Sequence, residues 1–327
     1  MNGYARIRST GSLLLGGGSS LGSGNGILRI IGNGSAGSAS ALTNGDVAVG
    51  VGADSLIEIR NGGLVSGSNI QLGSSSTSDA DIIVDGINSR LQATSGDIIF
   101  SGQGAGLTRS VMVSSGATIG ASGAQYGSML ETWRGDTITV TGAGSSATFE
   151  RAINNGGNIN VLNGGLVKQV EVPGLIDRWT NPAGFRSLYV GDTEQPAVVT
   201  ISGIDTNGTA SRVAVTRNAQ IGGFNQDGYV LDGSGNYQPI TTPTSGTMVV
   251  ENGGILKADG NVLVSETGTG GNGTLTIRNG GQVIATSVTI LEGGLLNGNG
   301  GTIAGNLIVD GGTVSPGNSP GTLTING

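Results

Sequence analysis

One phrase recurs along this chain and restricts its fold more than any other feature. The phrase is a short alternating apolar strand, a polar residue followed by two glycines, and then a second short strand. In the C-terminal part three of its polar-Gly-Gly turns begin at Asn252, Asn279 and Asp310, which gives spacings of 27 and 31 residues, with a shorter echo that begins at Glu292. A repeat of this size is one supersecondary unit that cannot bury its apolar side alone, so neighbouring units must stack.

The apolar parts of the phrase have the period of a half-buried strand. Leu275 and Ile277 alternate with threonines, which directs one set inward and the other outward. Runs this short cannot form helices of useful length. Glycine adopts positive φ at little steric cost, and asparagine tolerates it better than most residues, so Asn-Gly-Gly suits a sharp corner.

Asn-Gly is also the strongest signal for a tight hairpin, so a meander of hairpins is the alternative fold. Two observations favour stacking. The phrases keep their order and phase over long distances, and no region of different composition could cover the sheet of a meander. We therefore predict an all-β chain with one domain, residues 1–327, folded as a single right-handed parallel β-helix with loop inserts. Its coils would stack about 4.8 Å apart.

Composition agrees with a solenoid. Of the 327 residues, 65 are glycine and only 3% are aromatic, so the core must be thin and built from small aliphatic side chains. At roughly 20–25 residues per coil, we expect about 13–16 coils and a rod on the order of 65–75 Å long.

Several functional classes are disfavoured. The chain has no cysteine and no histidine, which excludes disulfides and thiolate chemistry. The net charge is −7 and the basic residues are scattered, so no stripe for nucleic acid is present. Neither a membrane-spanning run nor a signal peptide is visible, and we expect a fragment of a longer protein. We expect no cofactor and no metal; Asp227 and Asp232 could meet calcium beside Asn236, but turn chemistry explains them better.

Three stretches break the rhythm: residues 122–136, 173–196 and 222–246. They hold five of the seven prolines, and proline cannot donate to a strand ladder, so we expect inserts that leave the rod between coils. Aromatic side chains on loops of a rigid scaffold are good anchors for a partner, although they could instead cover the rod or pack within their loops. The candidate receptor-binding aromatics are Tyr126, Trp133, Trp179, Phe185, Tyr189, Phe224, Tyr229 and Tyr237.

The first insert ends in Arg134-Gly135-Asp136, the integrin-type tripeptide. In such a contact the arginine meets an acidic pocket while the aspartate completes the receptor's metal site. Chance explains the triplet better, because a glycine-rich chain produces it fairly often, and Asp136 directly precedes the strand that begins at Thr137. The three residues are therefore kept as candidate receptor contacts beside the aromatics.

The C-terminal part resembles a known family. Residues 295–327, which include the runs LNGNGGTIAGN and GGTVSPGNSPGTL, are similar to the passenger-associated transport repeat of bacterial autotransporters, the type V secretion pathway. The resemblance implies a passenger domain exported by a C-terminal β-barrel translocator, which would lie outside this sequence. It also implies a cell-surface or secreted location, anchored at the outer membrane in the full-length protein.

An enzyme is the weaker alternative. Residues 317–321 match G-x-S-x-G formally, but a nucleophilic serine needs a base and the chain has no histidine. Cleavage of polysaccharides would need clustered carboxylates or bound calcium, whereas the acidic residues are spread at about one per coil. We therefore predict a non-enzymatic adhesin for host cells, matrix or glycan. Self-association that drives aggregation and biofilm is the first alternative, and a polysaccharide-active enzyme is the second.

Overall fold

The computed structural model describes residues 6–16, 25–73, 78–100, 107–123, 128–171, 186–191, 196–223, 229–231, 237–239, 244–266, 271–317 and 321–327. Every regular element among these residues is a β-strand. No stretch of them forms a helix that is long and apolar enough to cross a membrane.

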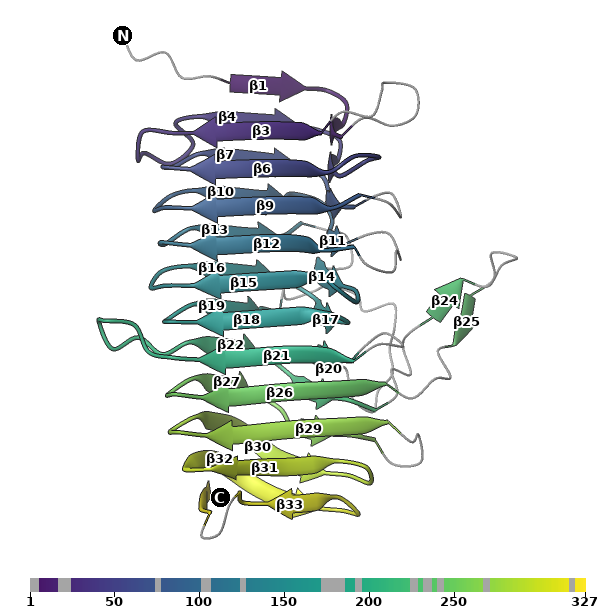
Figure 1. Cartoon of the computed structure of the whole chain (residues 1–327), viewed down its shortest axis with the longest axis vertical. Helices are drawn as coiled ribbons and strands as arrows, with labels where there is room; N and C mark the ends of the chain where they lie inside the picture. The colour runs from purple at the N-terminus through teal and green to yellow at the C-terminus, as the bar shows by residue number, and fades with distance from the viewer. Residues whose placement is uncertain are drawn as a thin grey trace.

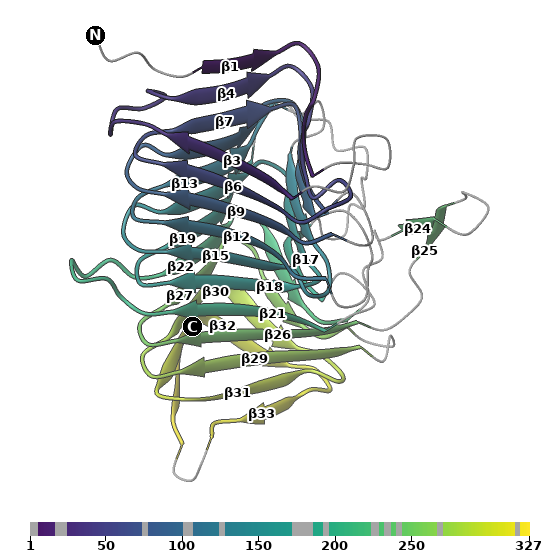
Figure 2. The same ribbon diagram turned by 45° about the horizontal axis from the view of Figure 1, so that its top comes forward.

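The strands wind into stacked coils with three faces, and both views show the coils lying one above another along the long axis (Figures 1 and 2). Face 1 is a sheet of eleven described strands in parallel order. These strands are β3 (Gly26–Ile31), β6 (Ser55–Arg60), β9 (Ala80–Asp85), β12 (Arg109–Ser114), β15 (Thr137–Thr141), β18 (Asn158–Leu162), β21 (Ala197–Ser202), β26 (Ser245–Glu251), β29 (Asn272–Arg278), β31 (Leu295–Asn299) and β33 (Thr313–Ser315).

Faces 2 and 3 follow face 1 in each coil, and they merge where β30 (Gln282–Ile290) and β32 (Gly301–Val309) run through both. Face 2 holds β1 (Arg6–Ser9), β4 (Ser40–Thr43), β7 (Leu64–Gly67), β10 (Arg90–Ala93), β13 (Thr118–Ala121), β16 (Ser146–Phe149), β19 (Leu166–Gln169), β22 (Arg212–Val215), β27 (Ile255–Ala258) and β34 (Leu323–Asn326). Face 3 holds β2 (Leu13–Leu15), β5 (Val47–Val49), β8 (Ile70–Leu72), β11 (Ile98–Phe100), β14 (Met129–Thr132), β17 (Ala152–Asn155), β20 (Arg186–Val190), β23 (Asn218–Ile221) and β28 (Val262–Val264).

The strand pairing confirms the parallel β-helix. Strands β6 and β7 lie on either side of Asn61-Gly62-Gly63, where a hairpin would pair them with each other. Instead β6 pairs in parallel with β3 and β9, and β7 pairs in parallel with β4 and β10. The meander of hairpins is therefore wrong, because each phrase bonds to the coils before and after it.

Each of the three positions in an Asn-Gly-Gly corner requires its residue for a different physical reason. At the corner after β18, Asn163 and Gly164 have φ of 50° and 90°, the left-handed region that asparagine and glycine tolerate best. The next residue, Gly165, needs its lack of a side chain for space: a Cβ there would lie 2.2 Å from the carbonyl oxygen of Val140 in the preceding coil. The phrase thus requires one residue that accepts positive φ, then glycine for conformation, then glycine for close stacking.

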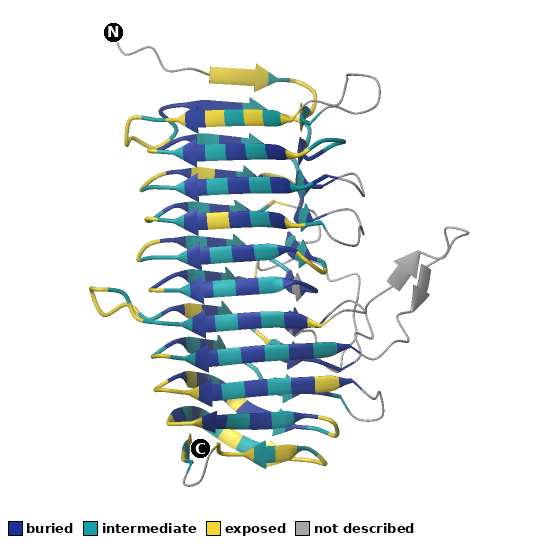
Figure 3. Cartoon of the chain, in the orientation of Figure 1, coloured by how far each residue is buried: buried dark blue, intermediate teal, exposed yellow. Residues whose placement is uncertain are grey.

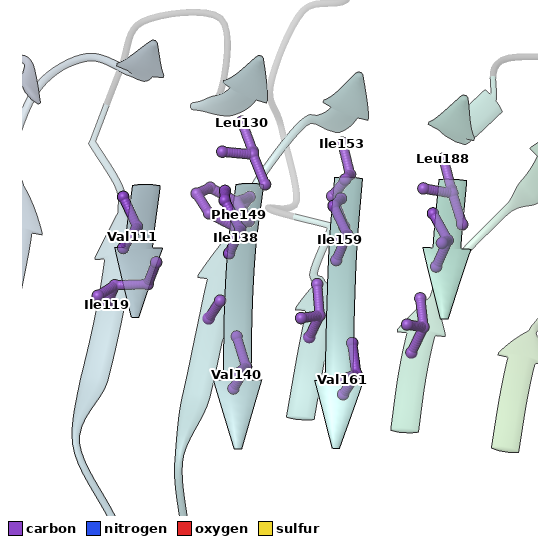
Figure 4. Packing of buried hydrophobic residues seen from close by; sticks show 14 of the residues in the cluster. Val111, Ile119, Leu130, Ile138, Val140, Phe149, Ile153, Ile159, Val161 and Leu188 are labelled. Atoms are coloured by element: carbon purple, nitrogen blue, oxygen red, sulfur yellow. The ribbon is translucent and has the colours of Figure 1, made fainter. Parts of the chain in front are cut away.

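The core is a set of aliphatic columns inside the three faces. Along one column of face 1, Ile57, Ile82, Val111, Ile138 and Ile159 follow one another in register and are all 0–1% exposed. Figure 4 shows such side chains pointing from the three faces toward a common centre. Burial of each is worth about 1.5–3 kcal/mol. The intervening residues point outward, which gives the alternation of buried and intermediate residues along each strand (Figure 3).

The expected coil size holds for only some of the coils. Ladder neighbours one coil apart are 21 residues apart between Thr276 and Asn297 and 25 between Glu58 and Ile83, but 29 between Arg29 and Glu58 and 49 between Ser202 and Glu251. Longer coils mean fewer coils. With eleven described strands on face 1, the rod is about 50 Å long rather than 65–75 Å.

The predicted inserts also need correction, because two of them contain strands of the rod. Residues 122–136 include β14, and residues 173–196 include β20. Residues 222–246 contain the hairpin β24 (Tyr229–Leu231) and β25 (Tyr237–Pro239), and among the described residues these two strands pair with each other and with no strand of the coils (Figure 1). At the neck of this third insert, Gly223 and Thr244 exchange two backbone hydrogen bonds of 3.1 and 2.9 Å.

Candidate functional site

The predicted aromatic contacts do not gather at one place among the described residues. Tyr189 lies within β20 of face 3 and is only 7% exposed, so its expected position in a loop was wrong. Trp133 follows β14 and packs, partly buried, against the hydrophobic core. Both residues belong to the rod, because strand pairing continues through stretches that the proline and aromatic content had marked as loops.

The positions of most other predicted aromatic contacts are not described by the structure. Tyr126, Trp179, Phe185 and Phe224 lie outside the described residues, as do Asp227, Asp232 and Asn236. Tyr229 and Tyr237 begin the two strands of the hairpin. These two tyrosines are thus the predicted contact residues that lie in the strand pair β24–β25.

The tripeptide Arg134-Gly135-Asp136 forms a turn directly after β14, and its aspartate faces the protein interior. The side chain of Asp136 is 0% exposed. Its Oδ1 accepts a 2.7 Å hydrogen bond from Nε of Arg109, whose side chain is 1% exposed, and its Oδ2 accepts one of 2.7 Å from the backbone N–H of Trp133. A carboxylate held in this way cannot complete a receptor's metal site, which corrects the expectation for Asp136.

Burial dominates the chemistry of this pair. Desolvation raises the pKa of Asp136 to about 6, and the opposing influences of the Trp133 N–H and the Arg109 guanidinium are smaller. Sequence reasoning missed Arg109, because an arginine at the start of a strand usually points to solvent. Only the register of the coils brings it against a residue 27 positions away.

Face 1 carries an outward surface that bears on self-association, although the sequence analysis assigned no residues to that alternative. We define the polar face as the outward side chains of β12, β15, β18 and β21. None of them is charged. They are Ser110, Met112, Ser114, Thr137, Thr139, Thr141, Asn158, Asn160, Leu162, Val198, Thr200 and Ser202.

Charged side chains bound the polar face at both ends. On the N-terminal side Arg60 bridges Glu58 and Asp85 at 3.3 and 3.2 Å. On the C-terminal side Arg278 pairs with Glu251 at 2.6 Å. Between these ends, the hydroxyls and amides of β15 and β18 make no side-chain hydrogen bond to any other described residue, so they are free to bind water or another surface.

Two neighbouring acidic residues with raised pKa values, Asp97 and Glu131, lie beside face 3. Burial raises the pKa of Asp97, against the backbone N–H of Met129, which donates to it at 2.8 Å. Burial, followed by the negative charge of Asp97, raises the pKa of Glu131 in β14. Two carboxyls with raised pKa values can arise at catalytic sites or from simple burial. In the part of the chain described here, no group of three acidic, histidine or cysteine residues is placed to hold a metal ion.

Comparisons with known proteins add little to this geometry. No protein-family model and no characterised protein matches the sequence. Among solved structures, the chain is similar to a crystal structure of a TibA fragment hyper-glycosylated by TibC. The two share 18% identity over 97% of this chain and 99% of that one, with a TM-score of 0.25. A superposition this loose carries no argument about function, so the proposals below rest on the chain's own residues.

Proposed function

We propose that this chain is a non-enzymatic autotransporter passenger that works at the bacterial cell surface as an adhesin. The resemblance of residues 295–327 to the transport repeat supports export through a C-terminal translocator. The observation that carries adhesion is the hairpin β24–β25, which departs from an otherwise regular rod. Proposed partners are a host receptor, matrix or glycan.

The neck of the hairpin insert permits a clean deletion. The Gly223–Thr244 bridge already closes the insert, so residues 224–243 can be replaced by Asn-Gly without moving β23 or β26. A matched control is the turn at residues 205–209, which is closed by the bridge between Ile204 and Ala210 and projects between β21 and β22. Replacing it by Asn-Gly shortens a projecting turn elsewhere on the rod.

The test displays full-length protein on a non-adherent bacterium and scores attachment to cultured host cells. The proposal expects attachment by the unmodified protein and by the 205–209 control, and its loss from the 224–243 variant. Attachment that survives the 224–243 deletion would remove the hairpin as the contact. Absence of attachment by any displayed form would count against an adhesin and would return the polysaccharide-active enzyme for testing.

The polar face favours self-association as a second function. An uncharged sheet surface with free hydroxyls and amides can hydrogen-bond to the same surface of another rod without bringing like charges together. We expect clumping of displaying cells to fall sharply with Thr139→Lys/Asn160→Lys, which places two charges at the centre of this face. Thr148→Lys, on an outward position of β16 in face 2, is the matched control. Clumping that both variants reduce equally, or that neither reduces, would contradict a role for the polar face.

A further inference from the structure

A hollow lies on the outside of face 1 near its C-terminal end, next to the polar face, because its lining residue Val249 pairs with Thr200. Its volume is about 320 Å³, and this size is at the lower end for small-molecule sites. Its lining residues are Val249, Thr276, Arg278, Asn297, Gly298, Asn299 and Gly317.

The hollow lies where the pairing of face 1 ends. Strands β31 and β33 pair as far as Asn297 and Ser315, and β33 ends at Ser315. Gly317 packs closely on β31, because a Cβ there would lie 2.7 Å from the carbonyl oxygen of Gly298. Side chains of three successive strands, β26, β29 and β31, line the hollow.

Two of the polar side chains in the walls each have one hydrogen-bond partner and keep further donors. Nε of Arg278 donates to Oε2 of Glu251 at 2.6 Å, which leaves the two terminal nitrogens of the guanidinium as donors. Oδ1 of Asn299 accepts a 3.4 Å hydrogen bond from the backbone N–H of Thr322, which leaves the amide nitrogen of Asn299 as a donor.

The chemistry of the walls specifies a ligand class. A guanidinium fork matches a carboxylate bidentately, while a hydroxyl and carboxamides both donate to and accept from the hydroxyls of a sugar. Arg278 supplies the first function, and Thr276 and Asn297, which point outward beside it, supply the second. We propose that the hollow binds a saccharide unit that carries a carboxylate.

This inference rests on the proposed adhesive function for its meaning in the cell, because it names a glycan ligand. Its test uses the purified chain and no cells, so the two proposals can fail separately. If the saccharide binds but displayed cells do not attach, the saccharide site is supported and the adhesin is rejected. If cells attach but the saccharide does not bind, the adhesin is supported and the saccharide site is rejected.

The probe is D-glucuronate, measured by saturation-transfer NMR against the full chain, with methyl glucoside as the neutral comparison and inorganic sulfate as a competing anion. We expect glucuronate to bind at least tenfold more tightly than methyl glucoside, and sulfate to compete only weakly because it lacks the hydroxyls. Arg278→Met should weaken glucuronate binding about tenfold or more, and Thr276→Val should weaken it by a smaller factor.

The chain offers a matched control at the opposite end of the same ladder. Arg60 is also an outward arginine of face 1 that is paired with acidic neighbours, and its side chain is 40% exposed against 51% for Arg278. Arg60→Met should leave glucuronate binding unchanged. The proposal would be overturned if glucuronate did not bind, or if methyl glucoside bound as tightly as glucuronate. It would also be overturned if sulfate by itself displaced glucuronate, or if the two arginine variants weakened glucuronate binding equally. Unfolding curves that match the unmodified chain would establish that each variant is folded.

Discussion

Replacing Arg109 tests whether the tripeptide aspartate is structural. Arg109→Met keeps most of the side-chain volume but removes the charge that faces Asp136 inside the protein. With both side chains at most 1% exposed, the remaining carboxylate would be buried without its charged partner. Breaking a buried ion pair in this way costs about 3–5 kcal/mol. The Coulomb energy of two unit charges 4 Å apart at an effective dielectric of 20 is of the same size, about 4 kcal/mol.

The cost should depend on pH with a definite sign. Desolvation already raises the pKa of Asp136 to about 6 from an ordinary value of 3.8, and losing the guanidinium would raise it further. A carboxyl whose pKa is higher in the folded state favours folding most when it is protonated, and this contribution is lost as pH rises through the folded-state pKa. The Arg109→Met variant should therefore be much less stable than the unmodified chain at pH 8, and closer to it at pH 5.

Stability in a solenoid is local, so the probe should be near the pair. Trp133 is three residues from Asp136, and the chain has two tryptophans, so a Trp179→Phe background leaves one local fluorophore. Urea unfolding followed by this fluorescence at pH 5 and pH 8 gives the required free energies. The double variant Arg109→Met/Asp136→Leu should recover most of the loss, because a well-packed apolar pair is often as stable as a buried ion pair.

A loss below about 1 kcal/mol at pH 8, or the same loss at both pH values, would refute the buried pair and make the tripeptide accessible again. The double variant also separates structure from recognition. We expect cells that display it to attach as well as the parent, because Asp136 takes no part in binding a receptor. Loss of attachment by a folded double variant would contradict this reasoning.

Three further predictions concern the corners and the acidic pair. Gly165→Ala should lower the free energy of unfolding by about 1–3 kcal/mol or more, because its Cβ would lie 2.2 Å from a carbonyl oxygen of the preceding coil. Urea unfolding measures this loss. Gly11→Ala is the control and should be nearly neutral, because no atom lies within 4 Å of the added Cβ. Asn163→Ala at φ 50° should cost about 1 kcal/mol, whereas Asn163→Gly should cost less; equal losses would contradict the left-handed corner. Glu131→Gln should raise the melting temperature at pH 8 and leave it unchanged at pH 3, because burial and Asp97 raise the pKa of Glu131 and so disfavour its charged form; an equal effect at both pH values would contradict that cause.

The fold could be predicted because its causes are local and repeated. At Asn163-Gly164-Gly165, the asparagine and both glycines are visible in the sequence, and each reports one constraint on the corner. The inward columns follow from period 2 alone. The coil length could not be predicted in the same way, because turns and loops between strands vary freely while the strands stay in register, as the 49-residue step from Ser202 to Glu251 shows.

The site residues were harder to predict because their contacts join different coils. Asp136 is buried only because register places Arg109 against it, and no local pattern marks an arginine that points inward. Tyr189 was assigned to a loop because prolines and aromatics surround it, yet β20 pairs with β17 and β23 and keeps it in the rod. For both Asp136 and Tyr189, the local amino-acid composition was interpreted correctly, but strand pairing between coils determined where the side chain lies.

The same physics explains where additions to the rod can occur. Each coil must return a strand to face 1 in register, but the segment between face 3 and face 1 is constrained only at its two ends. The Gly223–Thr244 bridge provides such a pair of fixed ends, and β26 still pairs with β21 although the hairpin intervenes. Because an insertion here costs loop entropy that grows slowly with length, the corner can accept a recognition element with little loss of stability. A rod of this kind can therefore change its contacts at the corner without altering its core.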